Sequence, residues 1–161
     1  MPAKLCLSCS KRAFSTSNIV MESSPRQVAW KKKIGLKTKF PGDRIPNLKK
    51  TLRKRFPRNA NYTASVDLGP EYSRRWVLFY AAEPKSPNQT YKKSAAEAYK
   101  KQFRNQGLTR ADQKGVVVFK VRCPQSYKEN NRVYAQHIHF MTANKNNKSW
   151  NPALFTVGAK C

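Results

Sequence analysis

The chain has 161 residues, and its 33 Lys and Arg outnumber its 8 Asp and Glu to give a formal charge of +25. That length fits one domain, or one domain with a tail. The charge favours partners that are polyanions or acidic protein surfaces, and it speaks against a free soluble enzyme, which rarely needs such a field. The sequence contains no apolar run of the ~18 residues that a spanning helix requires, so we expect no membrane span.

Residues 1–60 predict an extended basic arm. They carry 16 basic and 2 acidic side chains, and their apolar residues follow no lasting period of 2 or 3.6. The stretch IPNLKKTLRKRF favours a short basic helix that begins near Pro46 and ends before Pro57. Alone, such an arm buries too little apolar surface to offset its chain entropy. The densest basic cluster, which we predict to contact a polyanion or an acidic partner, consists of Lys49, Lys50, Arg53, Lys54, Arg55 and Arg58.

The first segment, MPAKLCLSCSKRAFSTSNIVMESS, is basic, Ser-rich and free of acidic residues until Glu22, a composition typical of a mitochondrial presequence. It contains Cys6 and Cys9, whose C-x-x-C spacing suits zinc or redox chemistry. No second pair with that spacing follows, because the other cysteines are Cys123 and Cys161. The sequence leaves open whether these cysteines are free thiols, form a disulfide or belong to a zinc site.

Residues 61–161 predict a mainly β domain, an antiparallel β-sandwich with one inserted helix. Short runs rich in branched and aromatic residues alternate with turn signals, which is typical of a sandwich and not of a βαβ sheet. We expect strands at 61–69, 74–82, 115–122, 132–143 and 152–159. The helix is predicted over SAAEAYKKQFRNQG, where Ser94 and Glu97 form a capping box and Gly107 suits the C-terminal stop.

The run VYAQHIHFM holds both histidines of the chain, His137 and His139. Side chains of a strand alternate between its faces, so the two imidazoles share one face with Cα atoms roughly 6–7 Å apart. This spacing suits a metal pair, but two ligands are too few, and acidic residues are scarce after residue 60. Tyrosines are plentiful, and a phenolate is a hard, charged ligand that favours ferric iron. The alternative is a pair of histidines packed and hydrogen-bonded within a sheet.

The stretch LTRADQKGVVVFKVRCPQSYKENNRVYAQHIHFMT resembles the core of the intradiol ring-cleavage (catechol) dioxygenases. Those enzymes show a T-D-x-x-G-x-Y-x-F strand, a P-x-x-Y loop and then R-P-A-H-I-H-F. This chain has the strand at Gly115, Pro124 with Tyr127, and HIHF ending at Phe140. Upstream, WVLFYAAEPKSPNQTY resembles the family's V-E-I-W-Q-A-D-x-x-G-x-Y strand and loop. The resemblance spans roughly residues 74–140 and implies a β-sandwich.

By this resemblance, two histidines and two tyrosines hold a non-haem Fe(III) that activates a catecholate for attack by dioxygen. His137 and His139 match the histidine pair, Tyr127 matches one tyrosine, and Tyr91 is the candidate for the other. The family's arginine, three residues before the first histidine, is replaced by Tyr134. A site without that positive charge is a poor catalyst, because preorganised charge stabilisation is often the largest catalytic term.

A shortened sandwich of this kind with a very basic N-terminal arm also resembles small virion proteins of large icosahedral DNA viruses. Three functions therefore remain open. The first, favoured by the charge and the missing arginine, is a structural component of a large assembly. It would be a minor capsid protein in the virion whose arm binds neighbouring subunits, with no cofactor expected.

The second function is a nucleic-acid-binding assembly protein, such as a mitochondrial ribosomal component located in the mitochondrion. Its Lys and Arg would track phosphates, and Trp30, Phe40 and Phe56 would stack on bases. The third is an Fe(III)-dependent intradiol-type dioxygenase, which needs the metal site to be intact.

Overall fold

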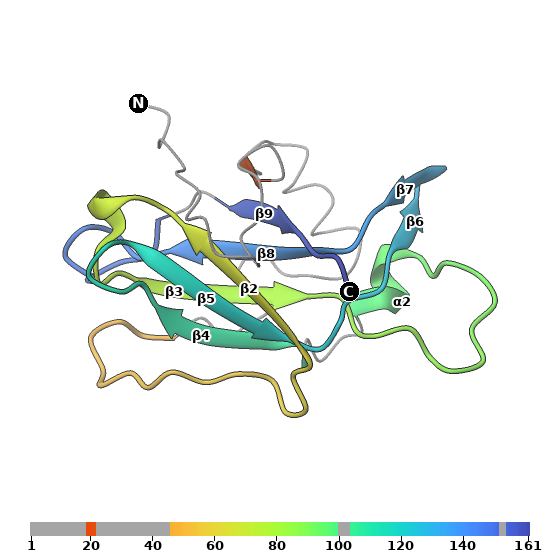
Figure 1. Ribbon diagram of the computed structural model, residues 1–161, viewed down its shortest axis with the longest axis horizontal. Helices are drawn as coiled ribbons and strands as arrows, with labels where there is room; N and C mark the ends of the chain where they lie inside the picture. Colours follow the sequence, from red (N-terminus) through yellow and green to blue (C-terminus); the bar gives the residue numbers. More distant parts are fainter. Residues whose placement is uncertain (1–18, 22–45, 100–103, 152–153) are drawn as a thin grey trace.

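Two antiparallel β-layers with one short α-helix at an end make up the part of the chain that the structure, a computed structural model, describes (Figure 1): residues 19–21, 46–99, 104–151 and 154–161. The elements in chain order are β1 (Ile19–Met21), β2 (Tyr62–Asp67), the 3-10 turn η2 (Pro70–Tyr72), β3 (Trp76–Ala81), α2 (Ala95–Tyr99), β4 (Gln106–Arg110), β5 (Val116–Val121), β6 (Tyr127–Glu129), β7 (Arg132–Tyr134), β8 (His137–Thr142) and β9 (Phe155–Gly158). The predicted mainly β, antiparallel fold with one α-helix is confirmed. The predicted arm lies outside the described residues up to residue 45, except for β1.

The larger layer is a five-stranded sheet in the order β1-β9-β8-β3-β4, and the smaller layer is the β2-β5 pair. Figure 1 shows β2 and β5 crossing in front of the larger sheet, while α2 and the β6-β7 hairpin lie together at one end. β8 pairs with β3 on one side and β9 on the other, which places His139 opposite both Tyr80 and Thr156. The centre of the sheet therefore carries the HIHF run.

The two central strands, β3 and β8, are buried on both faces, because five of the six residues of each strand are buried. Phe79 and Phe140 face the β2-β5 pair, where the Phe119 ring lies 5.3 Å from Phe79 and 5.1 Å from Phe140. The alternate side chains of the same strands, among them Tyr80 and Met141, face α2 and form a second core. The period of two within each strand thus separates a core centred on phenylalanine and aliphatic side chains from one that contains Tyr80, Tyr99 and Tyr127 and lies beside His139.

Helix α2 begins at the predicted capping box but does not extend to Gly107. Glu97 N–H donates to Ser94 Oγ at 3.4 Å, and Ser94 N–H donates to Glu97 Oε2 at 2.9 Å. The prediction that the helix runs to a stop at Gly107 is wrong, because residues 106–110 form β4 beside β3. A Cβ on Gly107 would lie 2.2 Å from Phe79 Cζ, so this position needs glycine for the close approach of an aromatic ring. No helix in the described ranges is long and apolar enough to cross a membrane.

The strand predicted over residues 132–143 is divided in two. Residues 132–134 form β7, which pairs with β6 through a two-residue turn at Asn130 and Asn131. Both asparagines have positive φ, 49° and 59°, as a type I′ hairpin turn requires. The chain then turns at residues 135–136 and enters the sheet as β8. Val133 is therefore half-exposed on the hairpin and does not share the face of the histidines.

The basic segment of residues 46–60 has turns at 48–50 and 58–59, is otherwise irregular and packs against the larger sheet, so the expected short helix is not formed there. Arg55 exchanges two backbone hydrogen bonds with Leu108 of β4, both 2.8 Å long. Trp150 Nε1 donates to the Pro46 carbonyl at 2.9 Å. A helix would set Lys50 beside Lys54 at a spacing of four residues, where like charges repel. An extended strand-like path separates these charges and satisfies the backbone on β4 instead.

Candidate metal centre

Four side chains from three elements converge beside α2. Tyr99 is the last described residue of α2, Tyr127 begins β6, and His137 and His139 lie on one face of β8. Tyr99 and His139 are each 1% exposed and Tyr127 is 2% exposed, whereas His137 is half-buried. The cluster therefore lies at the edge of the second core, with one ligand-type side chain near solvent.

The phenol oxygens and the Nε2 atoms all point into the same small volume. Tyr99 Oη lies 2.9 Å from His139 Nε2 and 3.2 Å from His137 Nε2. Tyr127 Oη lies 3.3 Å from His137 Nε2, and the two Nε2 atoms are 3.0 Å apart. In the absence of an ion, these distances correspond to a hydrogen-bonded cluster.

The outer contacts of the imidazoles fix their orientation. His137 Nδ1 lies 2.6 Å from the Ala135 carbonyl oxygen, which only accepts, so Nδ1 carries the proton. A neutral His137 then presents an Nε2 lone pair to the cluster. His139 Nδ1 lies 3.5 Å from Thr156 Oγ1, and its ring stacks on Tyr80 at 4.6 Å with an interplanar angle of 14°.

The two tyrosines are held relative to each other by contacts between α2 and β6. Glu129 Oε2 accepts the N–H of Ala95 at 3.2 Å, which joins the end of β6 to the start of α2. Lys128 N–H donates to the Lys93 carbonyl at 2.9 Å. The Tyr99 and Tyr127 rings meet edge to face with centroids 5.5 Å apart. The cluster is thus supported by backbone contacts on both sides.

The donor set fits a trivalent ion that takes phenolate ligands. Within the described ranges no three His, Cys, Asp or Glu side chains come together, so a metal at this place depends on the tyrosines. Bonds of about 2.0–2.2 Å to one ion leave neighbouring ligand atoms roughly 3 Å apart, which matches the observed separations. Two phenolates would supply two negative charges, and two neutral imidazoles would complete a set of four ligands.

The structure brings together three of the four residues selected from the sequence: Tyr127, His137 and His139. Tyr91, the fourth, is 66% exposed in the loop before α2 and takes no part in the cluster's described contacts. Tyr99 occupies that place instead. The signal for it is the helical spacing of Ala95, Ala98 and Tyr99, which form the buried face of α2 and point one tyrosine inward.

The position expected to hold an arginine is filled by an aromatic stack. The Tyr134 ring stacks on Tyr127 with centroids 5.2 Å apart. The Arg132 guanidinium lies 5.4 Å from the centroid of the Tyr134 ring. The Arg132 guanidinium, the nearest one along the chain, therefore contacts Tyr134 and not the four converging side chains.

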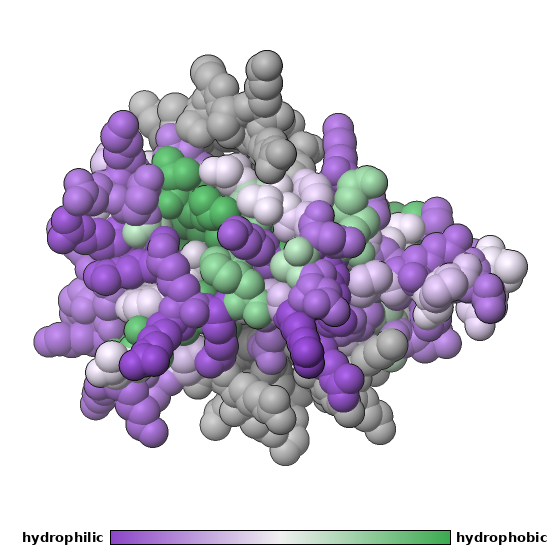
Figure 2. Space-filling model, turned by 60° about the horizontal axis from the view of Figure 1, so that its bottom comes forward, coloured by the Kyte–Doolittle hydropathy of each residue, from purple (hydrophilic) through white to green (hydrophobic). Residues whose placement is uncertain are grey.

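The six predicted basic contact residues are all exposed, on the segment that lies along β4. Figure 2 looks onto this lower side of Figure 1, where hydrophilic side chains surround a smaller hydrophobic area. Phe56 and Val118 are each 37% exposed, and Lys120 Nζ lies 5.5 Å from the Phe56 ring centroid. Among the residues that the structure describes, the ion pair is between Arg122 and Glu83, and neither residue belongs to this basic segment.

No family model matches the chain, and no significant match is found among curated proteins or solved structures. The interpretation of the site therefore depends on its own geometry.

Proposed function

We propose that the sandwich binds ferric iron through Tyr99, Tyr127, His137 and His139, in a site of the intradiol dioxygenase type. The single observation that carries this proposal is the convergence of two phenol oxygens on two Nε2 atoms, which are linked by four distances of 2.9–3.3 Å. Tyr99 adds support, since it completes the set although the motif resemblance had pointed to Tyr91. When bound, ferric iron would supply a Lewis acid that activates a catecholate toward dioxygen.

The chain's own residues contribute orientation and exclusion of water. The Ala135 carbonyl keeps the His137 proton on Nδ1, so that Nε2 is ready to bind. Tyr80 covers one face of the His139 ring, and Tyr134 covers Tyr127. Such outer partners typically change metal affinity about 10–100-fold when they are removed. We infer that these contacts preorganise the site for metal binding.

Turnover is expected to be slow, because Tyr134 stands where the intradiol enzymes carry an arginine, and the Arg132 guanidinium lies against the Tyr134 ring. Preorganised charge is commonly the largest catalytic term. The chain is thus proposed as an iron-binding protein first, with ring cleavage of catechols as the reaction to assay.

The test is titration of the purified full chain with ferric nitrilotriacetate, followed by the visible absorption that arises from phenolate-to-iron charge transfer. Tyr99→Phe removes only the hydroxyl and should weaken binding by more than the roughly 10–100-fold cost of losing an outer partner. Tyr91→Phe is the matched control and should bind as the unmodified chain does. A colourless, iron-free wild-type protein, or equal effects of the two substitutions, would contradict the proposal.

A second candidate function is a structural role in a large assembly, with a minor capsid protein of a virion as the specific proposal. The observation that favours it is the row of exposed basic side chains on a segment that Arg55 fixes to β4. None of the six forms an ion pair with an acidic residue of the described part. They are therefore available to an acidic neighbouring subunit or to nucleic acid, with salt-dependent binding in either case.

This role is tested with a variant in which Lys49, Lys50, Arg53 and Lys54 are replaced by Gln. The expected result is loss of the chain from purified particles, while Lys145→Gln with Lys148→Gln, on an exposed turn, leaves incorporation unchanged. Full incorporation of the four-site variant would contradict the assembly role. If the isolated protein instead binds RNA with an affinity that falls steeply between 50 and 200 mM salt, the nucleic-acid function is supported.

A further inference from the structure

Gln136 joins the two segments that carry the proposed ligands. It directly precedes His137, and its Nε2 donates to the carbonyl of Pro124 at 2.7 Å. Pro124 lies three residues before Tyr127. The Gln136 carbonyl in turn accepts the N–H of Ala159 at 2.9 Å, which brings the C-terminal residues to the same junction. The separation of Tyr127 from His137 therefore depends on contacts made at Gln136.

A disulfide between Cys123 and Cys161 closes this junction covalently. Gln136 Nε2 lies 3.4 Å from Cys123 Sγ and 3.9 Å from Cys161 Sγ, so the amide sits against the bond. The disulfide connects the start of the Tyr127 loop to the residues after β9, which pairs with β8. It thus ties that loop to the layer that contains the histidines.

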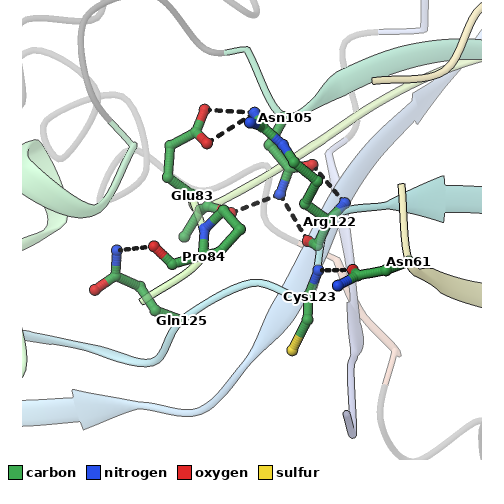
Figure 3. Close-up of polar contacts among 8 residues, drawn as sticks. Asn61, Glu83, Pro84, Asn105, Arg122, Cys123 and Gln125 are labelled. Carbon is green, nitrogen blue, oxygen red and sulfur yellow. Dashed lines mark hydrogen bonds and ion pairs between the residues drawn. The ribbon is translucent and has the colours of Figure 1, made fainter. Parts of the chain in front are cut away.

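The start of the loop is also held, independently of the disulfide, by polar contacts to the segments after β3 and before β2 (Figure 3). Arg122 pairs with the buried Glu83 at 2.7 Å, and Gln125 N–H donates to the Glu83 carbonyl at 3.2 Å. Cys123 N–H donates to Asn61 Oδ1 at 2.7 Å. These contacts do not involve β8 or β9. Opening the disulfide would therefore leave the loop attached to Glu83 and Asn61 while weakening its link to the histidine strand.

The disulfide is accessible to a reductant. Cys161 is exposed, and Cys123 lines a hollow of about 270 Å³ together with Lys85, Lys92 and Ser126. The two lysines give this hollow a positive charge that favours an approaching thiolate. The attacking species in thiol–disulfide exchange is the thiolate.

We propose that the Cys123–Cys161 disulfide is a redox switch for the ferric centre, an inference that rests on the iron-binding function proposed above. A dithiol reductant transfers two electrons and two protons: its thiolate attacks one sulfur, the S–S bond breaks, and its second thiol releases both cysteines as thiols while the reductant becomes a disulfide. With the bond open, Tyr127 is held less firmly against His137. Iron affinity then falls by the roughly 10–100-fold typical of losing an outer support.

The test uses the full chain and gallium(III), a redox-inert substitute for ferric iron, so that a reductant does not alter the ion. Binding is followed by the ultraviolet difference spectrum of tyrosine ionisation. Cys123→Ser with Cys161→Ser should bind gallium roughly 10–100-fold more weakly than the oxidised wild type, and wild type treated with a phosphine reductant should behave like that variant. Cys6→Ser with Cys9→Ser is the matched control and should bind like wild type.

Gln136→Leu keeps the disulfide but removes the hydrogen bond to Pro124, so it should also weaken binding, and it decides the matter if the double serine variant does not fold. Equal affinity of oxidised and reduced wild type, or an unchanged affinity of folded Gln136→Leu, overturns the switch. Failure of the oxidised wild type to bind either gallium or iron overturns the proposed function itself, which distinguishes the two failures.

Discussion

Asn105 shows how one buried amide connects three backbone groups of different segments (Figure 3). The side chain is 0% exposed. Its Nδ2 donates to the carbonyls of Ala82 at 2.6 Å and Arg122 at 2.9 Å, and its Oδ1 accepts the N–H of Arg122 at 2.9 Å. A single residue thus joins the segment before β4 to the ends of β3 and β5.

Asn105→Leu keeps the side-chain volume but removes all three hydrogen bonds. We expect a loss of about 2–5 kcal/mol in the free energy of unfolding, because each buried polar group left without a partner costs roughly 1–3 kcal/mol. Chemical denaturation measures this difference. Asn88→Leu, on an exposed loop, is the control and should change stability little. Equal stability of the two variants would show that water replaces the amide.

The placement of individual site residues was only partly predictable. The shared face of His137 and His139 follows from the period of two, and both lie on one face of β8 as expected. Tyr99 was missed because the sequence predicted one long helix up to Gly107. Within such a helix, the short buried face that contains Tyr99 does not stand out. Choosing between Tyr91 and Tyr99 requires knowing where α2 packs, and no local pattern supplies that information.

At the scale of elements, the start of α2 is set by charge as well as by hydrogen bonds. The Ser94 hydroxyl, and then its backbone N–H, bind the Glu97 carboxylate and hold its pKa below the usual value. A carboxylate with a lowered folded-state pKa stabilises the protein above its unfolded pKa of about 4.3. That contribution is lost as the pH falls through the folded-state pKa.

Glu97→Gln should therefore lower the melting temperature at pH 7, and the difference from wild type should shrink as the pH is lowered below about 4. Thermal unfolding at several pH values measures it. In a Ser94→Ala background the same substitution should have little effect, because the partner hydroxyl is gone. A difference that stays constant from neutral to acidic pH would contradict this account of the cap.

Elements were predictable from the sequence where local signals were strong. The predictions failed where strand pairing overrode the local signals. The capping box at Ser94 gave the correct start of α2, and the apolar runs gave the correct type of β3 and β5, with bounds one or two residues too wide. β4 was not predicted, because its residues follow directly on the helical pattern and were assigned to the end of the helix. Only the pairing with β3 identifies them as a strand. The β6-β7 hairpin was missed because its strands have three residues each, too few for periodicity, although two adjacent asparagines mark its turn.

At the scale of the whole molecule, composition predicted the class of fold but not the order of its strands. The five-stranded sheet sets β3 between β4 and β8, and residues 111–136 separate β4 from β8 in sequence. Such an order depends on which faces fit together across the molecule. The net charge follows directly from the sequence, but the position of the basic cluster was not predicted. Residues 46–60 lie against the sheet and do not form a separate arm.

The backbone pairing between Arg55 and β4 has a consequence for how copies of this protein meet. β4 is the outermost strand of the five-stranded sheet, and an uncovered edge strand invites pairing with another chain. Here Leu108 already exchanges its two hydrogen bonds with Arg55, and the neighbouring lysines and arginines repel an identical edge. The segment proposed to attract anionic partners therefore also protects the sheet from edge-to-edge aggregation.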